Sequence, residues 1–466
     1  MPRRLPKVDC KLIIVIKSVT GALFKSFVKR NIKQFKYEHL EYLFHAVSLI
    51  VFSPNCSPDV CNALSESLEV AINRCEGSKL VSKSAKVMTE NLQTLLANIV
   101  FGRVLGPNLA ALTKHDIIGG CALLVSLFRT LMSAVAVQHM VKNHTASILS
   151  LGWNLLQHVS ERSPQPSDKI LGSVAIRYFT KMLNEYFKQL VEVEAWEYFE
   201  KLLQGDSGSL VDLMARILLE PASENSPCIF YPFGIEDIES NMNKSKATLI
   251  HIFQHFTNLT FSMQVFKRDP KNFAFYERWI SMTMRIIEST HLLGKRIPKE
   301  ESCQGCLVAA TNYMINICDS NEFYVIYQKS HRALIVDFIL PHLVLTDRER
   351  EDFERNEVEF CSYALDLVDS RQRNTETPKV RVAKLLDKLC IRIDGCLTFL
   401  IQTVFGLVDV VSQGLDLSAA LSAHPILADV LGSEMFKKVG KMDILDMCLL
   451  TLAIVSNQIL ERADLK

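Results

Sequence analysis

Glycine is scarce in this chain, and regular alternation of apolar and polar residues is missing. The 466 residues include only 18 glycines, too few for the many tight turns of an all-β protein. Apolar residues instead recur at the three- and four-residue spacing of amphipathic helices, between short polar breaks. The sequence therefore excludes a β-sandwich or β-barrel and predicts an all-α protein.

An excess of one charge is also missing. Lysine and arginine total 52, aspartate and glutamate total 51, and the formal net charge is +1. Proteins that bind nucleic acid through its phosphates usually carry a basic excess. We therefore expect no nucleic-acid partner, and any electrostatic recognition has to come from local clusters of charge.

A secretory signal is lacking, although the chain has 13 cysteines. Met1–Lys7 is basic and contains proline, and Lys17 interrupts the apolar run that follows it. The cysteines are odd in number and scattered through apolar helical stretches. We expect reduced, buried thiols without disulfides, in a cytoplasmic or nuclear protein.

Apolar runs of the roughly 20 residues that cross a bilayer are lacking as well. Ile117–Phe128 stops at Arg129, and Cys396–Val411 contains Gln402 and Asp409. Both runs are predicted to be helices buried between neighbouring helices, and we expect no membrane insertion.

Complete catalytic or metal-binding motifs are absent. Residues 205–208 read Gly-Asp-Ser-Gly, like the nucleophile motif of chymotrypsin-like proteases, but the β-barrels and the histidine motif that this chemistry needs are missing. Cys303 and Cys306 form a C-x-x-C pair without a second pair of zinc ligands. The sequence has no H-E-x-x-H, Walker A or glycine-rich dinucleotide motif. We expect no enzyme, no metal and no cofactor.

The helical pattern is clearest in Val380–Ile393. Val382, Leu385, Leu386, Leu389, Cys390 and Ile393 share one face, and charged residues, Lys379 and Arg392 among them, occupy the others. Thr377 is the predicted N-cap and Pro378 the first helical residue. Helices of this kind over the whole chain predict a HEAT/armadillo-like α-solenoid superhelix of about ten helical hairpins. The segment Met442–Leu460 is apolar almost all round, so we expect it to be covered on several sides.

Two charged segments are candidate binding surfaces. Phe24–Asn31 is basic and aromatic, and the alternative interpretation has its aromatic residues in the core and its lysines solvated. Thr346–Glu359 is dense in acidic residues. It is either a solvated charge run or an electrostatic clamp for a basic patch on a protein partner.

These two segments resemble landmarks of the CAS-type exportins, in the importin-β superfamily of karyopherins. FKSFVKRN is similar to the early helix F-K-N-[FY]-[IV]-K-R-N-W of that family. The second stretch is similar to I-x-P-N-M, an acidic insert D-E-E-x-F-E-D-N-x-x-E-[YF], and a helix ending L-x-x-L-C. The matching residues are Ile339, Pro341, Asp347, Glu349, Glu351, Phe353, Glu354, Asn356, Glu359, Phe360, Asp369, Ser370, Thr377, Lys379, Leu386, Leu389 and Cys390.

The resemblance implies a receptor that binds the GTP form of Ran, carries importin-α from nucleus to cytoplasm and passes the pore on nucleoporin FG repeats. It implies shuttling between nucleus and cytoplasm, and a shortened or fragmentary chain. The candidate Ran contacts, carried over by matching position, are Lys25, Lys29, Arg30, Asn31, Asp347, Glu349, Glu351, Asp352, Glu354 and Asn356.

The expected organisation is one continuous solenoid over residues 1–466. Residues 1–45 form partial N-terminal repeats, 46–337 HEAT repeats, 338–378 a repeat with the acidic insert, and 379–466 further repeats. Two alternatives stay open: an importin-type karyopherin that releases cargo on Ran·GTP, and a HEAT-repeat scaffold unrelated to Ran.

Overall fold

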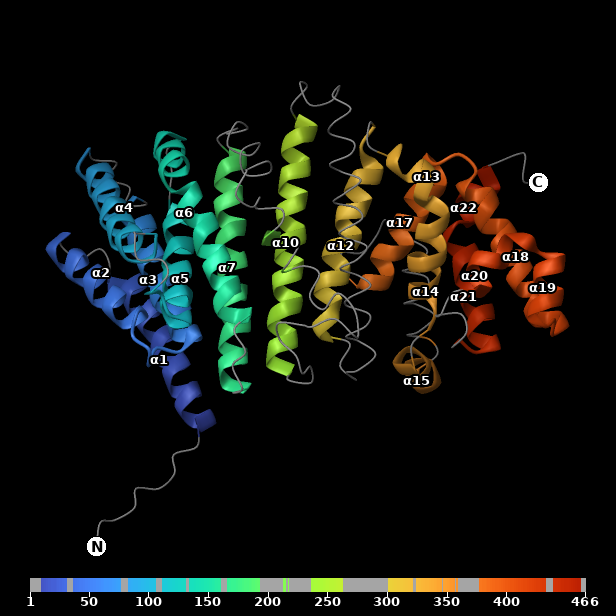
Figure 1. The fold of residues 1–466 in the computed structure, drawn as a ribbon, viewed down its shortest axis with the longest axis horizontal. Helices are drawn as coiled ribbons and strands as arrows, with labels where there is room; N and C mark the ends of the chain where they lie inside the picture. The colour runs from blue at the N-terminus through green and yellow to red at the C-terminus, as the bar shows by residue number, and fades with distance from the viewer. Residues whose placement is uncertain are drawn as a thin grey trace, which may run out of the picture. The chain divides into compact units, whose positions relative to one another are not determined.

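The computed structural model describes most of the chain, and every regular element in the described part is a helix (Figure 1). The chain forms two compact units. Unit 1 comprises Met1–Leu259 and Glu288–Ser302, and unit 2 comprises Thr260–Ile287 and Cys303–Lys466. The described residues are 10–31, 37–76, 83–105, 111–130, 134–160, 166–192, 213–214, 217, 236–262, 301–321, 324–345, 347–356, 358, 377–432 and 439–461.

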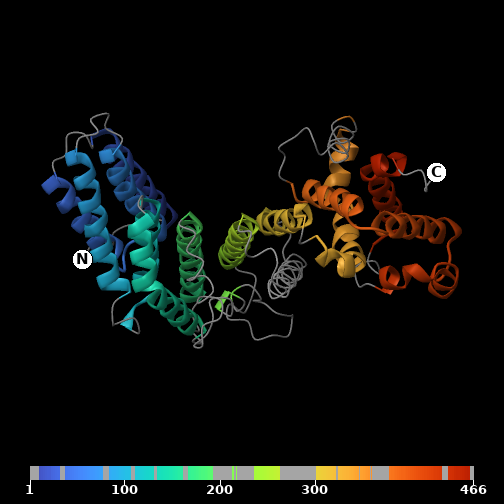
Figure 2. The same ribbon diagram turned by 90° about the horizontal axis from the view of Figure 1, so that it is seen from above.

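Unit 1 is a two-layered stack of helices. One layer consists of α1, α3, α5 and α7, in which α3 packs against α1 and α5, and α5 packs against α7. The second layer consists of α2 and α4, which pack on each other, together with α6 (Figures 1 and 2). Stacked hairpins of this kind are the architecture of an α-solenoid, which confirms the predicted fold class. The helices are α1 (Cys10–Asn31), α2 (Tyr37–Val51), α3 (Pro58–Glu76), α4 (Lys83–Val104), α5 (Lys114–Thr130), α6 (Ala134–Ser160), α7 (Pro166–Glu192) and, mostly in this unit, α10 (Glu236–Ser262).

Helix α5 is the buried centre of unit 1, as the apolar run Ile117–Phe128 predicts. Every residue of that run is buried. Two glycines allow close approach of the neighbouring helices: a Cβ on Gly119 would lie 2.7 Å from the carbonyl oxygen of Val51, and one on Gly120 would clash with the side chain of Val104. A backbone atom cannot move aside easily, so Gly119 fixes how closely α5 approaches the end of α2.

Unit 2 is also helical in its described part. Its elements are α12 (Glu301–Asp319), which belongs to this unit from Cys303 on, α13 (Ile326–Ala333), the π-helix η4 (Leu334–Ile339), α14 (Leu340–Leu343), α15 (Asp347–Arg355), α17 (Pro378–Arg392), α18 (Cys396–Gln413), α19 (Leu417–Ala423), the 3₁₀ turn η5 (Pro425–Leu427), α20 (Ala428–Gly432), α21 (Lys441–Ile454) and α22 (Ser456–Glu461). The core of this unit lies where α17, α18 and α21 pack against one another and against α14.

The stretch from α13 to α14 is one helical path that changes its hydrogen-bond register. The N–H of Leu340 bonds to the carbonyl of Ile335, five residues earlier, as in a π-helix. Pro341 follows at once, and proline has no N–H to continue an α-helical register. In the sequence, an apolar stripe of Leu334, Ile335, Phe338 and Ile339 predicts a helix that stops near Pro341. The observed path instead continues through Pro341 to Leu343.

Helix α17 confirms the most detailed sequence prediction. It runs from Pro378 to Arg392, and the Thr377 hydroxyl accepts from the N–H of Val380 at 3.4 Å. The apolar stripe from Val382 to Cys390 is buried. One expectation is wrong: Lys379, placed among the charged residues off the apolar face, is only 7% exposed.

Helix α18 is long and apolar enough to cross a membrane by length and composition, and it alone has that property in the described part of the chain. It packs against α17 and α21, which lie in the core of unit 2. A core helix of a soluble protein has the same composition, so the expectation of no membrane insertion stays a prediction.

Helix α21 is covered on one side and open on another. Ile444, Met447, Cys448 and Thr451 are buried, whereas Met442 and Leu449 are 68% and 66% exposed. The cover on several sides that its all-round apolar sequence suggests is therefore incomplete within the described residues.

Candidate protein-binding surfaces

The basic segment at the end of α1 has one anchored face and one open face. Val28 is buried, whereas Phe27 is 54% exposed, so the alternative in which Phe24, Phe27 and Val28 all face the core is wrong for Phe27. Lys29 and Arg30 are exposed. The last turn of a helix favours basic residues, because its carbonyls carry partial negative charge.

Two other candidate residues of this segment take part in contacts inside unit 1. The Lys25 ammonium lies 2.5 Å from the Glu66 carboxylate of α3. The Asn31 amide donates to the carbonyl of Phe27 at 2.9 Å, one turn back along the helix. Lys25 and Asn31 are thus tied to unit 1 by these contacts.

The pair Lys25–Glu66 is the first step of an ion-pair ladder across α1, α3, α5 and α7. Arg129 of α5 lies 3.7 Å from Glu69 of α3 and 3.2 Å from Glu185 of α7. Lys188 adds a contact of 3.1 Å to Glu185. We call Lys25, Glu66, Glu69, Arg129, Glu185 and Lys188 the charge ladder.

The pKa values of the carboxylates in the charge ladder are shifted in opposite directions. Burial opposes ionisation of Glu66 and Glu185, yet hydrogen bonds from Lys25 and Asn62 to the first, and from Arg129 and Lys188 to the second, hold both pKa values below the usual glutamate range. Burial dominates at Glu69 and raises its pKa despite Arg129. Arg129 therefore favours the ionised form of Glu185 more strongly than the ionised form of Glu69.

We expect Glu185→Gln to lower the free energy of unfolding by about 1–2 kcal/mol at pH 7, because Arg129 and Lys188 lose a partly buried partner. A carboxylate with a depressed folded pKa contributes stability above its unfolded pKa, near 4.5, and loses it as the pH falls through the lower folded value. The difference between variant and unaltered chain should therefore shrink below about pH 4.5. Urea unfolding of the variant and the unaltered chain, at pH 7 and below about pH 4.5, measures this difference in stability.

The control is Glu90→Gln, which removes an exposed carboxylate of α4. It should change stability by less than about 0.5 kcal/mol at either pH. A loss at Glu185 that persists undiminished at low pH would contradict an electrostatic role for the charge ladder.

The acidic segment of unit 2 forms helix α15 over Asp347–Arg355. Glu351 and Glu354 are exposed, as are Arg355 and Asn356. Arg355 lies 3.4 Å from Glu351, one turn away on the same surface. We call Glu351, Glu354, Arg355 and Asn356 the outer face of α15.

Two ion pairs hold the start of α15 against the core of unit 2. The Glu349 carboxylate lies 2.5 Å from the ammonium of Lys379 in α17. The next residue, Arg350, pairs with Asp443 of α21 and donates to the carbonyl of Leu345 at 3.3 Å. Adjacent residues of opposite charge thus reach two different helices, which fixes the orientation of α15.

Lys379 is the central residue of this attachment. Besides Glu349, its ammonium donates at 3.0 Å to the carbonyl of Val344, the residue that ends α14. Carbonyls at a helix end lack partners inside the helix. One buried lysine therefore satisfies the end of α14 and positions α15.

The structure thus separates the acidic candidates into two groups. Glu349 serves the fold, and Glu351, Glu354 and Asn356 lie on the outer face of α15. Asp347 and Asp352 belong to the helix, and their side chains lie outside the described residues. The basic candidates belong to unit 1 and the acidic ones to unit 2.

Sequence reasoning missed Asp443, Val344 and the charge ladder. Asp443 lies in the first turn of α21, and its carboxylate also accepts from the N–H of Gly440 at 3.0 Å, so an acidic residue three positions after a glycine signals a helix start. Nothing in the local sequence points from Asp443 to Arg350.

No group of three or more potential metal ligands occurs among the residues that the structure describes. Cys306 of the C-x-x-C pair is buried, and the side chain of Cys303 lies outside the described residues, as do residues 205–208. The closest described thiols are those of Cys56 and Cys61, 3.4 Å apart. Hydrogen bonding to Cys56 and burial raise the pKa of Cys61 far above its usual range, so it stays a thiol.

Comparisons with known proteins show a likeness to solved structures but not to known sequences. No family model matches the sequence, and no curated protein matches it. A solved structure described as the exportin Cse1 in its cargo-free, cytoplasmic state aligns with 95% of this chain at 13% identity and a TM-score of 0.40. The chain spans about half the length of that exportin, since 52% of it is covered.

Proposed function

We propose that this chain is a karyopherin-type nuclear transport receptor that binds Ran·GTP and exports importin-α from the nucleus to the cytoplasm. It acts by binding and carries out no catalysis. Its passage through the pore uses nucleoporin FG repeats, and it shuttles between nucleus and cytoplasm. The proposal rests on the resemblance of residues 24–31 and 338–390 to CAS-type exportins and on the geometry of those segments.

The observation that carries the proposal is the outer face of α15. A helix this polar gains little from packing, and isolated helices of its length are marginal in water. It is nevertheless held by Lys379 and Asp443, which reach Glu349 and Arg350 on its inner side. Glu351 and Glu354 are left exposed, as an electrostatic contact for a basic protein surface requires.

The basic segment of α1 supplies a contact of opposite sign. Phe27, Lys29 and Arg30 present an exposed aromatic ring beside two cations. Aromatic residues and arginine are the side chains most enriched at the energetic centres of protein interfaces. We assign the acidic outer face of α15 and this basic segment to separate surfaces of Ran·GTP.

The test is a titration of the purified chain with Ran loaded with GTP or with GDP, with importin-α present or absent. We expect binding of Ran·GTP, at least about tenfold weaker binding of Ran·GDP, and tighter Ran·GTP binding in the presence of importin-α. Coupling between two ligands is reciprocal, so an exportin shows mutual strengthening and an importin mutual weakening. If importin-α weakens Ran·GTP binding, the chain is an importin rather than an exportin. If binding is the same for Ran·GTP and Ran·GDP, the chain is a scaffold unrelated to Ran.

A further inference from the structure

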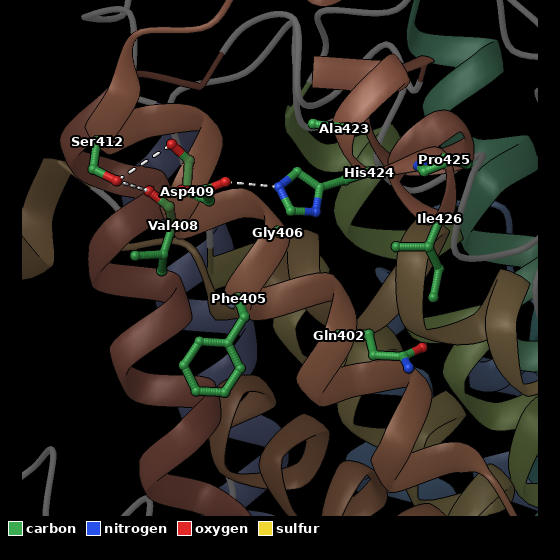
Figure 3. A pocket seen from close by; sticks show the side chains of 10 residues that line it. All are labelled: Gln402, Phe405, Gly406, Val408, Asp409, Ser412, Ala423, His424, Pro425 and Ile426. Carbon is green, nitrogen blue, oxygen red and sulfur yellow. Dashed lines mark hydrogen bonds and ion pairs between the residues drawn. The ribbon is translucent and has the colours of Figure 1, made fainter. Parts of the chain in front are cut away.

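A surface groove of about 560 Å³ lies in unit 2, between α18 and the segment formed by α19 and η5 (Figure 3). It belongs to neither charged segment discussed above. Phe405 and Val408 of α18 line one side, and Pro425 and Ile426 line the other. The groove is therefore a mainly apolar trough between two helical segments that are adjacent in the sequence.

A glycine in α18 allows the two sides to meet. A Cβ on Gly406 would lie 3.1 Å from Cδ1 of Leu427 and 3.4 Å from Cγ of His424. The distance to Leu427 is tighter than a normal contact, so a larger residue at position 406 would push the Leu427 side chain of η5 away from α18. Gly406 thus holds the base of the groove narrow while its rim stays open.

An aromatic side chain stands at the rim. Phe405 is 59% exposed, and its ring projects from α18 (Figure 3). Exposed aromatic side chains next to a concave apolar surface are typical anchors of protein interfaces. The ring offers an apolar contact and a π-face that attracts cations.

Polar groups are concentrated at one end of the groove. The Asp409 carboxylate lies 2.8 Å from Nε2 of His424, and Gln413 donates to its other oxygen. Its side chain is 39% exposed. Each carboxylate oxygen accepts two hydrogen bonds, so Asp409 has acceptor capacity left for a ligand.

Asp409 lines the groove, and the stretch of sequence that forms the groove is acidic. Between Arg392 and Lys437 the sequence contains no lysine or arginine, whereas Asp394, Asp409, Asp416, Asp429 and Glu434 all fall in that interval. The chain as a whole is nearly neutral, so this interval is a local acidic field. Such a field favours cationic ligands and repels acidic ones.

We infer that this groove is a docking site for a basic peptide segment of a protein partner. An apolar or aromatic side chain of that segment packs on Phe405 and Ile426, and an adjacent lysine or arginine pairs with Asp409. The charge of Asp409 decides between occupants, since this carboxylate attracts a basic segment and repels an acidic one. The inference does not depend on binding of Ran.

The test uses a short fluorescein-labelled peptide with lysines on both sides of a central Phe-Leu pair, titrated with the full chain and read by fluorescence anisotropy. We expect saturable binding, at least about tenfold stronger than for peptides in which glutamates replace the lysines or serines replace the apolar pair. Phe405→Ser and Asp409→Asn should each weaken binding by about tenfold or more, which is the loss of one anchor or one charged hydrogen bond.

Matched controls lie outside the groove. Leu417→Ser removes an exposed apolar side chain, and Glu461→Gln removes an exposed carboxylate of α22; both should bind the lysine peptide like the unaltered chain. Circular dichroism verifies that each variant keeps its helices. Equal binding of the glutamate peptide, or full binding by Phe405→Ser, would overturn the inference. Self-association abolished by Phe405→Ser would assign the groove to a second copy of this chain instead.

Discussion

Reversing two charges on the outer face of α15 is expected to weaken binding of Ran·GTP by a hundredfold or more. The variant is Glu351→Arg with Glu354→Arg. Close charge pairs across protein interfaces contribute roughly 1.5–7 kcal/mol each, and like charges in contact cost several kcal/mol. Two charge reversals should therefore cost more than about 2.7 kcal/mol of binding free energy, which corresponds to a hundredfold loss of affinity.

The fold should tolerate this reversal. Both carboxylates are exposed, and the contacts that hold α15 come from Glu349 and Arg350. The matched control is Asp394→Arg with Glu461→Arg, which reverses two exposed acidic residues elsewhere in unit 2 and should keep affinity within about threefold. Equal loss in the control would show a general effect of net charge, and unaltered affinity in the α15 variant would remove α15 from the interface.

Replacing Lys379 by methionine is expected to lower the free energy of unfolding of unit 2 by about 2–4 kcal/mol. The change removes both partners that the ammonium serves, the Glu349 carboxylate and the Val344 carbonyl. Removing one member of a buried ion pair leaves an uncompensated charge, which typically costs about 3–5 kcal/mol. The estimate is lower here because the Glu349 side chain is 18% exposed and can be partly hydrated.

Urea unfolding followed by circular dichroism measures this loss, with Lys384→Met as the control on a more accessible face of the same helix. The double variant Lys379→Met with Glu349→Gln should recover part of the stability, because it removes the unpaired charge. A single variant as stable as the control would contradict the assigned role of Lys379. The double variant should also bind Ran·GTP more weakly than the unaltered chain, since α15 loses one of its two attachments.

Elements with strong local signals were predictable from the sequence. Thr377 and Pro378 mark the start of α17, and the spacing from Val382 to Cys390 identifies its buried face. The run Ile117–Phe128 is buried on all sides, as its composition indicates. In each case the information lies within a few helical turns.

The attachment of α15 could not be predicted from the sequence, because it depends on residues that are far apart along the chain. Lys379 looks like an ordinary first-turn lysine, and only the folded chain brings it to Val344 and Glu349. The charge ladder likewise joins residues of different helices, such as Arg129 and Glu185. Pairing at such distances in sequence depends on how helices stack, which local periodicity does not encode.

The π-helix before Pro341 shows a further limit. Leu334, Ile335 and Phe338 are buried as the stripe predicts, but the sequence suggests that the helix stops at the proline. The register shift to a bond between residues 340 and 335 allows the path to continue. Helix propensity identifies Pro341 as a helix breaker. Whether the helical path continues past it depends on the packing of η4 against α17 and α20.

Hydrogen exchange of the full chain, alone and with Ran·GTP or Ran·GDP, tests the central claim most directly. The account predicts that Ran·GTP slows exchange at the last turns of α1, around Phe27–Asn31, and along α15, around Glu351–Asn356, while α18 and α19 are unaffected. Ran·GDP at the same concentration should protect neither segment. Protection by Ran·GTP elsewhere in the chain, with α1 and α15 unchanged, would contradict the account.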